Sequence, residues 1–325
     1  MAREHFGSRM GVLLAMAGGA VGLGNMWRFP YLVGKNGGAA FILVYLLFVV
    51  FLCLPILVSE YALGRRTQKN AFGAFKMLSK NKSWSLIGIF AVLAAVCVLS
   101  FYCVVGGWSV KYLVESCKFN MPILDSSYFT GFISSSFAPV IYTLIFLALT
   151  GSVLVLGIQK GIERFSKVMM LLLCLLIILI AIRSVTLPGA MEGMKYLFVP
   201  NLNALNGKAL LEALGQSFFS LSIGCGTVLT YASYVSKKEN IITTSFMVAA
   251  FDTLFALVAG IAIIPAVFAI AYMNGATPEI GAGPGLVFIT LPSVFNAMPM
   301  GNIVAILFFV TLLIAAITSA ISLLE

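Results

Sequence analysis

The residues with the greatest capacity for binding chemistry lie together in the first apolar segment, between Gly18 and Pro30. This stretch reads GGAVGLGNMWRFP, so four glycines, an amide and an arginine occur where a membrane-spanning helix is normally uniformly apolar. Glycine weakens a helix, and a backbone group bared to hydrocarbon is costly unless a partner satisfies it. The segment therefore predicts a broken helix whose freed carbonyls and amides bind an ion or a polar ligand.

A second segment of this kind, QSFFSLSIGCGT, covers residues 216–227. Two glycine-interrupted spans in corresponding places are typical of inverted-repeat transporters. The alternative is that the glycines only permit close packing between helices. Polar and ionisable side chains within the apolar segments favour the functional interpretation, because such groups are costly in a membrane; they are Asn25, Arg28, Glu60 and Asp252.

The elements that must position these residues are membrane helices. The chain is 61% hydrophobic and 10% charged, and its apolar runs are continuous, which excludes a soluble domain and argues against a β-barrel. We predict an all-α polytopic fold, a single domain over 1–325, with a first five-helix repeat over 1–186 and an incomplete second repeat over 209–325. The eight predicted spans are 9–33, 39–64, 84–114, 138–158, 166–186, 209–235, 241–273 and 301–325.

The charges predict the orientation of these spans. With a cytoplasmic N-terminus, the inner segments hold 13 of the 20 Lys and Arg residues, as the positive-inside rule requires. The net charge of +9 is thus a topology signal rather than a sign of nucleic-acid binding. We expect a basic inner loop over 65–83, outer loops over 115–137 and 187–208, and an outer segment over 274–300 whose helical part can cover an entrance. No cleavable signal peptide is evident.

The six cysteines show neither metal-ligand spacing nor a disulfide framework. The chain ends at Glu325 directly after an apolar helix, and we expect further sequence to follow it.

At these motifs the chain resembles the neurotransmitter:sodium symporter family, and its bacterial leucine-transporter-like members in particular. The matching motifs are GLGN at 22–25, WRFP at 27–30, NGGAAF at 36–41, SLS at 220–222, TYASY at 230–234, FITLP at 288–292 and TS at 318–319. The resemblance implies eleven or twelve spans and sodium-coupled symport of an amino acid by alternating access, without enzymatic chemistry. It places the protein in the bacterial inner membrane and leaves a homodimer open.

By this resemblance, two sodium sites are expected. The first would use the Ala20 carbonyl, the side chains of Asn25, Ser220 and Asp252, and the substrate carboxylate. The second would use the carbonyls and hydroxyls of Gly18, Val21, Ala315, Thr318 and Ser319. Because Asp252 can supply a negative charge, we expect transport to need no chloride.

The resemblance also implies a substrate site. The amides of Leu23 and Gly24 and the hydroxyl of Tyr102 would bind the carboxylate. The amine would meet the carbonyls of Ala20, Phe219 and Ser220 and the hydroxyl of Ser222. The side chain would lie among Val98, Phe219, Cys225, Ser319 and Leu323. The family often has a bulky aromatic where this chain has Cys225, so we expect an apolar or aromatic substrate larger than glycine.

Gating residues follow from the same resemblance. Arg28 corresponds to an outer-gate arginine, and its acidic partner would lie beyond Glu325. Arg3 corresponds to an inner-gate arginine, supported by Ser233 and Tyr234, while Glu60 would brace the broken helices. The alternatives to symport are a non-transporting amino-acid sensor on the same fold and, less favoured by an enclosed site, an ion channel.

Overall fold

The structure is a computed structural model that describes residues 6–118, 125–236, 239–278, 283, 285–296 and 300–325. Within these ranges every regular element is a helix. The α-helices are α1 Arg9–Ala20, α2 Phe29–Lys35, α3 Ala39–Phe48, α4 Leu54–Thr67, α5 Ala71–Leu78, α6 Ser85–Ser116, α7 Ser126–Ile133, α8 Ala138–Val155, α9 Arg164–Val185, α10 Ala190–Phe198, α11 Gly207–Ser220, α12 Thr227–Ala232, α13 Ile241–Met273, α14 Leu291–Asn296 and α15 Gly301–Leu324. The π-helical turns are η1 Gly24–Arg28, η2 Val49–Cys53, η4 Ile158–Glu163 and η6 Leu286–Thr290, and the 3₁₀ turns are η3 Lys82–Trp84 and η5 Leu202–Ala204.

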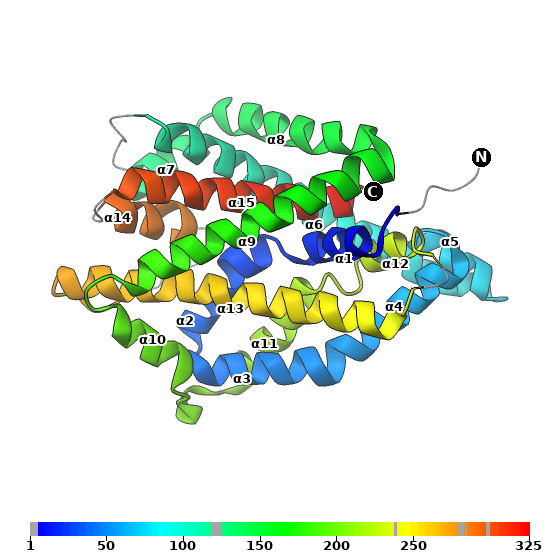
Figure 1. Ribbon diagram of the computed structural model, residues 1–325, viewed down its shortest axis with the longest axis horizontal. Helices are drawn as coiled ribbons and strands as arrows, with labels where there is room; N and C mark the ends of the chain where they lie inside the picture. Colours follow the sequence, from blue (N-terminus) through cyan, green and yellow to red (C-terminus); the bar gives the residue numbers. More distant parts are fainter. Residues whose placement is uncertain (1–5, 119–124, 237–238, 279–282, 284, 297–299) are drawn as a thin grey trace.

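The long helices run side by side along the longest axis of the molecule (Figure 1). Among the described residues, six helical stretches are long and apolar enough to cross a membrane, and the bent pair α1 and η1–α2 makes a seventh. The remaining predicted span is α11 followed by α12, whose halves of 14 and 6 residues are each too short to cross alone. The predicted all-α polytopic fold with broken helices one and six is confirmed.

Two sequence boundaries were wrong for the same reason. The fifth span begins at Ile158 rather than at 166, and the predicted inner loop over 65–83 contains α5. In both places we took charged residues to mark a loop. The structure instead places charged residues on helices there: Glu163 pairs with Lys167 one turn later at 2.6 Å, and Lys76 of α5 is exposed.

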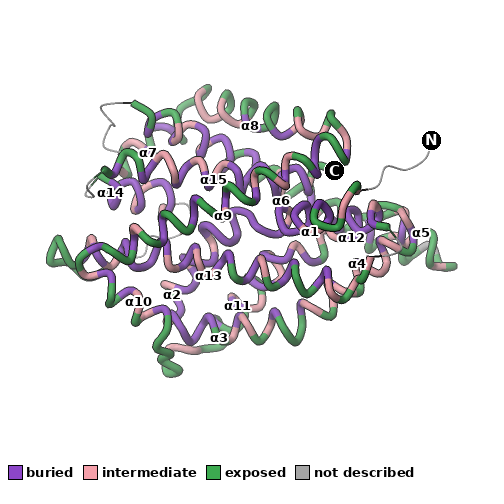
Figure 2. The backbone as a smooth tube through the Cα atoms, viewed as in Figure 1, coloured by how far each residue is buried: buried purple, intermediate pink, exposed green. Residues whose placement is uncertain are grey.

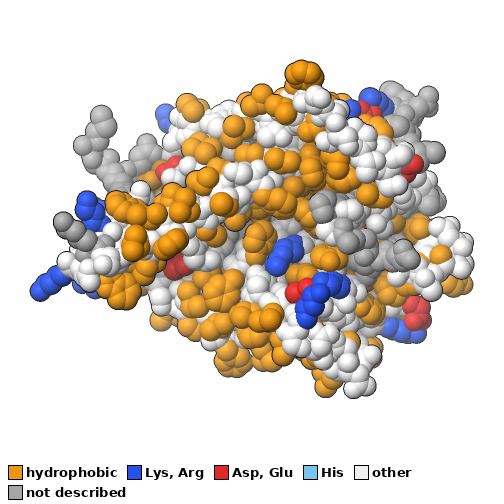
Figure 3. All heavy atoms as spheres, turned by 180° about the vertical axis from the view of Figure 1, so that it is seen from behind, with side chains coloured by type: hydrophobic (Ala, Val, Ile, Leu, Met, Phe, Trp, Pro, Cys, Tyr) orange, Lys and Arg blue, Asp and Glu red, His pale blue; other side chains and the backbone are white. Residues whose placement is uncertain are grey.

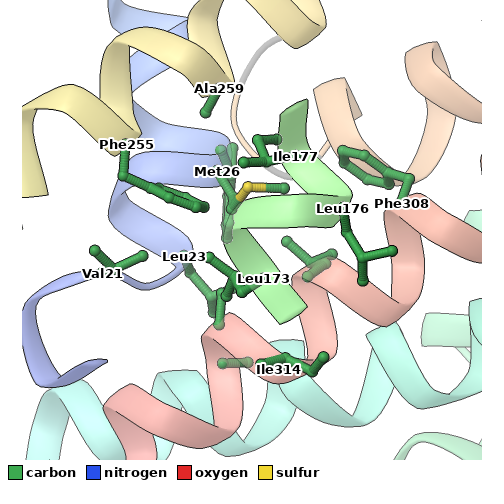
Figure 4. Close-up of a cluster of buried hydrophobic side chains, with 14 of the residues drawn as sticks. Val21, Leu23, Met26, Leu173, Leu176, Ile177, Phe255, Ala259, Phe308 and Ile314 are labelled. Atoms are coloured by element: carbon green, nitrogen blue, oxygen red, sulfur yellow. The ribbon is translucent and has the colours of Figure 1, made fainter. Parts of the chain in front are cut away.

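The broken first helix lies in the middle of the bundle. Val21, Leu23 and Met26 are at most 1% exposed. They point towards apolar side chains of α9, α13 and α15, among them Leu173 and Phe255 (Figure 4). Around this centre, the outer face of α8 is exposed and apolar (Figure 2), and apolar side chains cover much of the rear surface (Figure 3). This pattern fits a bundle whose polar centre is shielded and whose rim contacts lipid.

Short helices close the two ends of the bundle. α7, α10 and α14 lie at one end, and α5, α12 and the start of α1 lie at the other (Figure 1). The helical part expected within 274–300 is present as η6 and α14. Phe288 of η6 stacks on Phe129 of α7 at 5.7 Å and lies edge-on to Tyr112 of α6 at 5.0 Å. Ring pairs at these distances anchor the covering segment to the spans beneath it.

Candidate functional site

The first span breaks between Ala20 and Gly24, where its two halves meet at 50°. The Asn25 side chain closes the break, because its Oδ1 accepts the Gly22 amide at 3.0 Å. The Gly22 carbonyl in turn accepts from the amides of Asn25 and Met26 at 3.1 and 3.2 Å. Just before the break, the Gly18 carbonyl lies near the Ser319 hydroxyl of α15 and the Gly19 carbonyl near the Ser222 hydroxyl of the second broken span.

Five oxygen-bearing residues meet where α1 touches α15. Ser319 Oγ lies 3.1 Å from the Val21 carbonyl and 3.4 Å from the Gly18 carbonyl. Thr318 Oγ1 lies 3.0 Å from the Ile314 carbonyl and 3.1 Å from the Ala315 carbonyl of its own helix, and a Cβ on Gly18 would sit 3.5 Å from Thr318 Cβ. These are the residues predicted to form the second sodium site, and the structure brings them together.

A buried carboxylate lies on the other side of the break. Asp252 of α13 is 0% exposed and accepts from the Asn25 amide at 2.8 Å and from the Ser220 hydroxyl at 2.7 Å. Asn25 also donates to Ser220 Oγ at 3.1 Å. No Lys or Arg in the described part of the chain forms an ion pair with Asp252. A carboxylate buried without a cation is unfavourable, so this cluster is suited to binding one.

The second broken span reaches back to the first. Its unwound segment has three residues with positive φ, namely Ser222 at 54°, Gly224 at 84° and Gly226 at 75°. The Gly224 amide donates to Glu60 Oε1 at 2.8 Å, and the Ser222 hydroxyl donates to the Gly19 carbonyl at 3.3 Å. Glu60 thus lies where a brace is expected, and the two breaks are in direct contact.

Several hydrogen-bond donors lie together at the start of η1, the first turn after the break. The Tyr102 hydroxyl lies beside the backbone amides of Leu23 and Gly24 and the hydroxyl of Ser319. Helix starts favour anions because their amides and the helix dipole point outwards. This corner can therefore hold a carboxylate.

The five residues expected around the substrate side chain are only partly brought together. Cys225 and Leu323 line a cavity of about 280 Å³ between α5, α6, α12 and α15, together with Ala95, Leu99, Thr227 and Thr230 among others. Val98, Phe219 and Ser319 do not line it. Along the chain, Phe219 precedes the positive-φ residues Ser222 and Gly224, and Cys225 follows them.

A polar network joins η1 to α11 beside the site. Arg28 donates to Gln216 Oε1 at 2.6 Å and lies 5.2 Å above the Phe219 ring. Gln216 also donates to the Gly24 carbonyl at 3.1 Å. One turn further out, Glu212 pairs with Lys35 at 2.5 Å. Arg28 is thus held by α11 itself within the described residues.

A further group of polar contacts lies near the N-terminal segment and the end of α12. Arg3 lies outside the described residues, whereas Tyr234 donates to Glu325 Oε1 at 2.5 Å and Ser233 donates to the Thr230 carbonyl at 2.5 Å. The amide preceding α1 is bound separately: Glu163 accepts from the Gly7 amide at 2.6 Å and from the Ser8 hydroxyl at 2.8 Å. Ser8 also caps α1 by accepting the Gly11 amide at 3.0 Å.

With this geometry in place, comparisons with known proteins identify the family. Residues 3–130 and 133–325 match the sodium:neurotransmitter symporter family. The chain is 42% identical over 325 residues to YhdH of Bacillus subtilis, described as an uncharacterized sodium-dependent transporter, covering 99% of this chain and 71% of that protein. The chain belongs to the sodium:neurotransmitter symporter family. The symporter is also 30% identical over 358 residues to the sodium-dependent serotonin transporter of Drosophila melanogaster, covering 98% of this chain and 57% of that one.

A solved structure agrees with the fold. The crystal structure of MhsT in complex with L-phenylalanine is 44% identical, with a TM-score of 0.89, and the match covers 100% of the symporter chain and 73% of MhsT. The protein is therefore a multi-pass, sodium-dependent membrane transporter and not an enzyme.

Three polar residues of the symporter site were missed in the sequence. Glu212 and Gln216 precede Ser220 at intervals of four residues, so a helical face running outwards from the break could have found them. Glu163 gave no such signal as a contact of the N-terminal segment, because the Gly7 amide and the Ser8 hydroxyl that it accepts lie more than 150 positions away in the chain.

Replacing Gly22 with alanine is expected to weaken amino-acid binding by about tenfold or more. A Cβ there would lie 2.3 Å from Ser319 Oγ and 2.9 Å from Tyr102 Oη, so both hydroxyls must move, and overpacking of this kind typically costs about 1–3 kcal/mol. Sodium-dependent binding of a labelled amino acid measures the effect. Gly151→Ala is the matched control, since a Cβ there meets nothing within 4 Å. Equal affinities for the two variants would contradict the assignment.

Proposed function

We propose that this symporter couples the uptake of an apolar or aromatic amino acid to sodium ions across the bacterial cell membrane by alternating access. The observation that carries the proposal is the fully buried Asp252 carboxylate, which meets Asn25 and Ser220 beside the helix break and has no cationic partner among the described residues. A bound sodium ion supplies the positive charge that this cluster lacks.

The first sodium site comprises the Ala20 carbonyl and the side chains of Asn25, Ser220 and Asp252. Asn25 Oδ1 accepts the Gly22 amide with one lone pair, and its second lone pair can bind an ion. The carboxylate of the substrate completes the site. Ion and substrate then stabilise each other, which is the basis of coupling.

The second sodium site comprises the carbonyls of Gly18, Val21 and Ala315 and the hydroxyls of Thr318 and Ser319. This assignment is supported by an excess of acceptors over donors. Ser319 has one hydroxyl hydrogen but two carbonyl oxygens within 3.4 Å, so one carbonyl is left without a hydrogen bond from it. A hard cation at this point would be bound by oxygens alone and would hold α1 against α15.

The substrate carboxylate binds to the amides of Leu23 and Gly24 and to Tyr102. Its amine binds to the carbonyls of Ala20, Phe219 and Ser220 and to the Ser222 hydroxyl. The side chain extends past Val98 and Ser319 towards Cys225 and Leu323. The L-phenylalanine in the MhsT complex supports an aromatic or large apolar substrate.

Two gates enclose this site. Arg28, bound to Gln216, covers it from outside, and Ser233, Tyr234 and Arg3 contribute to closure on the cytoplasmic side. This orientation, with a cytoplasmic N-terminus, rests on the 13 of 20 basic residues assigned to that side. Because Asp252 provides the balancing negative charge itself, transport proceeds without chloride.

The test is uptake of labelled amino acids into proteoliposomes containing the intact transporter. We expect uptake to require an inward sodium gradient, and phenylalanine, tyrosine, tryptophan and leucine to compete at least tenfold better than glycine. A strict preference for glycine or alanine would overturn the substrate class. Sodium-dependent binding without uptake would instead favour a sensor on the same fold.

A further inference from the structure

The cytoplasmic helix α5 presents a basic and apolar surface that the transport site does not use. Between residues 65 and 87 the chain has six Lys and Arg residues and no Asp or Glu. Three of these lysines, Lys69, Lys76 and Lys80, are exposed, and within the described part of the chain none of them forms an ion pair with a carboxylate. Such a concentration of uncompensated positive charge attracts anions.

Large apolar side chains lie among these lysines. On α5, Phe72, Met77 and Leu78 are 38%, 50% and 37% exposed, and Trp84 of the adjoining turn η3 is 56% exposed. The Lys76 ammonium lies 5.9 Å from the centre of the Phe72 ring, so charge and apolar surface are adjacent. An exposed apolar surface with interspersed lysines is typical of segments that lie in a membrane interface.

The surface is fixed at the level of the membrane boundary. α6, which spans the membrane, begins one residue after Trp84. Its first turns present Leu86, Phe90 and Leu93 outwards at intervals of four and three residues, each more than half exposed, which marks a face towards lipid chains. Trp84 therefore lies where acyl chains give way to headgroups, the position tryptophan favours.

The inner face of α5 is tightly packed, so the exposed residues have a defined position. Ala71 and Ala74 are at most 3% exposed. A Cβ on Gly88 of α6 would lie 2.5 Å from the Phe72 Cα, and a Cβ on Gly226 would lie 2.8 Å from the Ala71 Cβ. α5 thus contacts both a long span and the unwound part of broken span six, at one end of the bundle (Figure 1). Basic side chains project at that same end when the molecule is seen from behind (Figure 3).

We propose that α5 and η3 form a docking site for anionic phospholipids of the cytoplasmic leaflet. Lys69, Lys76 and Lys80 bind the phosphate-bearing headgroups, and Phe72, Met77 and Trp84 contact the upper acyl chains. Charge complementarity selects the occupant, because the surface has no acidic residue to bind a cationic headgroup or peptide. Since α5 touches Gly226, a bound lipid lies next to the half-helix that lines the cavity beside Cys225. The proposal rests on the cytoplasmic orientation proposed above.

The experiment measures lipid preference around Trp84 in the intact protein. Nanodiscs containing brominated phosphatidylglycerol or brominated phosphatidylcholine quench tryptophans in contact with that lipid, and the part absent in Trp84→Phe is assigned to Trp84. We expect phosphatidylglycerol to be enriched over phosphatidylcholine by about tenfold or more, since a lysine near an anionic surface contributes up to about a fivefold preference. In the triple variant K69Q/K76Q/K80Q the ratio should fall to within twofold of unity.

The matched control is K118Q/K195Q/K208Q, which removes the same charge from exposed lysines at the opposite end. It should keep the phosphatidylglycerol preference. Equal ratios in the two triple variants, or a ratio near one in the unmodified protein, would overturn the proposal. Sodium-dependent amino-acid binding in detergent checks that both triple variants fold. Because the lipid ratio is measured without substrate, it can fail while the transport proposal stands, and the reverse also holds.

Discussion

Substituting Asp252 with asparagine is expected to lower sodium affinity about a hundredfold or more, and with it sodium-dependent amino-acid binding. Asparagine keeps the shape of the side chain but removes the only charge in the cluster with Asn25 and Ser220. Removing one partner of a buried charge pair costs about 3–5 kcal/mol, which corresponds to a hundredfold change or more. Sodium titrations of labelled amino-acid binding in detergent measure the effect.

Glu192→Gln provides the control for that experiment. Glu192 pairs with Lys195 at 2.7 Å, but both side chains are more than 60% exposed, so its loss should leave sodium affinity unchanged. The same variants test chloride. Replacing chloride with gluconate should not affect the unmodified protein, whereas any residual uptake by Asp252→Asn should require chloride. If Asp252→Asn had the same sodium affinity as the unmodified protein, Asp252 would not be a sodium ligand. If uptake by the unmodified protein required chloride, Asp252 would not supply the balancing charge.

Substituting Glu163 with alanine is expected to open the cytoplasmic side and to speed modification of Cys225 about tenfold or more. The carboxylate accepts from the Gly7 amide and the Ser8 hydroxyl, and it pairs with Lys167. Each hydrogen bond to a charged group contributes about 1.5–3 kcal/mol, so losing even one shifts an open–closed equilibrium by an order of magnitude. The readout is the alkylation rate of Cys225 in a background where the other five cysteines are replaced by serine.

Glu239→Ala is the comparison for this opening experiment. Its carboxylate reaches Arg9 only at 3.7 Å, and the arginine side chain is 62% exposed, so the alkylation rate should change less than twofold. Glu163→Gln should give an intermediate rate, because the amide oxygen can still accept the Gly7 amide. If alanine at 163 and alanine at 239 gave the same rate, the N-terminal segment would not be held closed by Glu163.

The two broken spans could be predicted because their signals are local. Glycines beside Asn25, and glycines beside Ser222, interrupt apolar runs that would otherwise be continuous, and hydrocarbon penalises such interruptions strongly. The carbonyls around Ser319 and the carboxylate cluster at Asp252 then followed from residue types that matched a family pattern.

Other features depended on contacts that no local pattern carries. Glu163 appeared to belong to a loop, since its charge is balanced by Lys167 and by the distant Gly7 amide only after the chain has folded. The hydrogen bond from Arg28 to Gln216 also joins residues 188 positions apart, and no local pattern indicates it. Nor does any local pattern indicate that Cys225 and Leu323 line a common cavity that Phe219 does not line.

The turn at Ser222 has a mechanical consequence. For a residue other than glycine, a backbone φ of 54° is disfavoured by roughly 1–2 kcal/mol. Here the Ser222 hydroxyl donates to the Gly19 carbonyl of the first span, which helps to hold this conformation. If α1 swings away, that contact is lost, and Ser222 can return to a right-handed conformation that redirects α12 relative to α11. The movements of the two interrupted helices, which are far apart in the chain, would then be coupled.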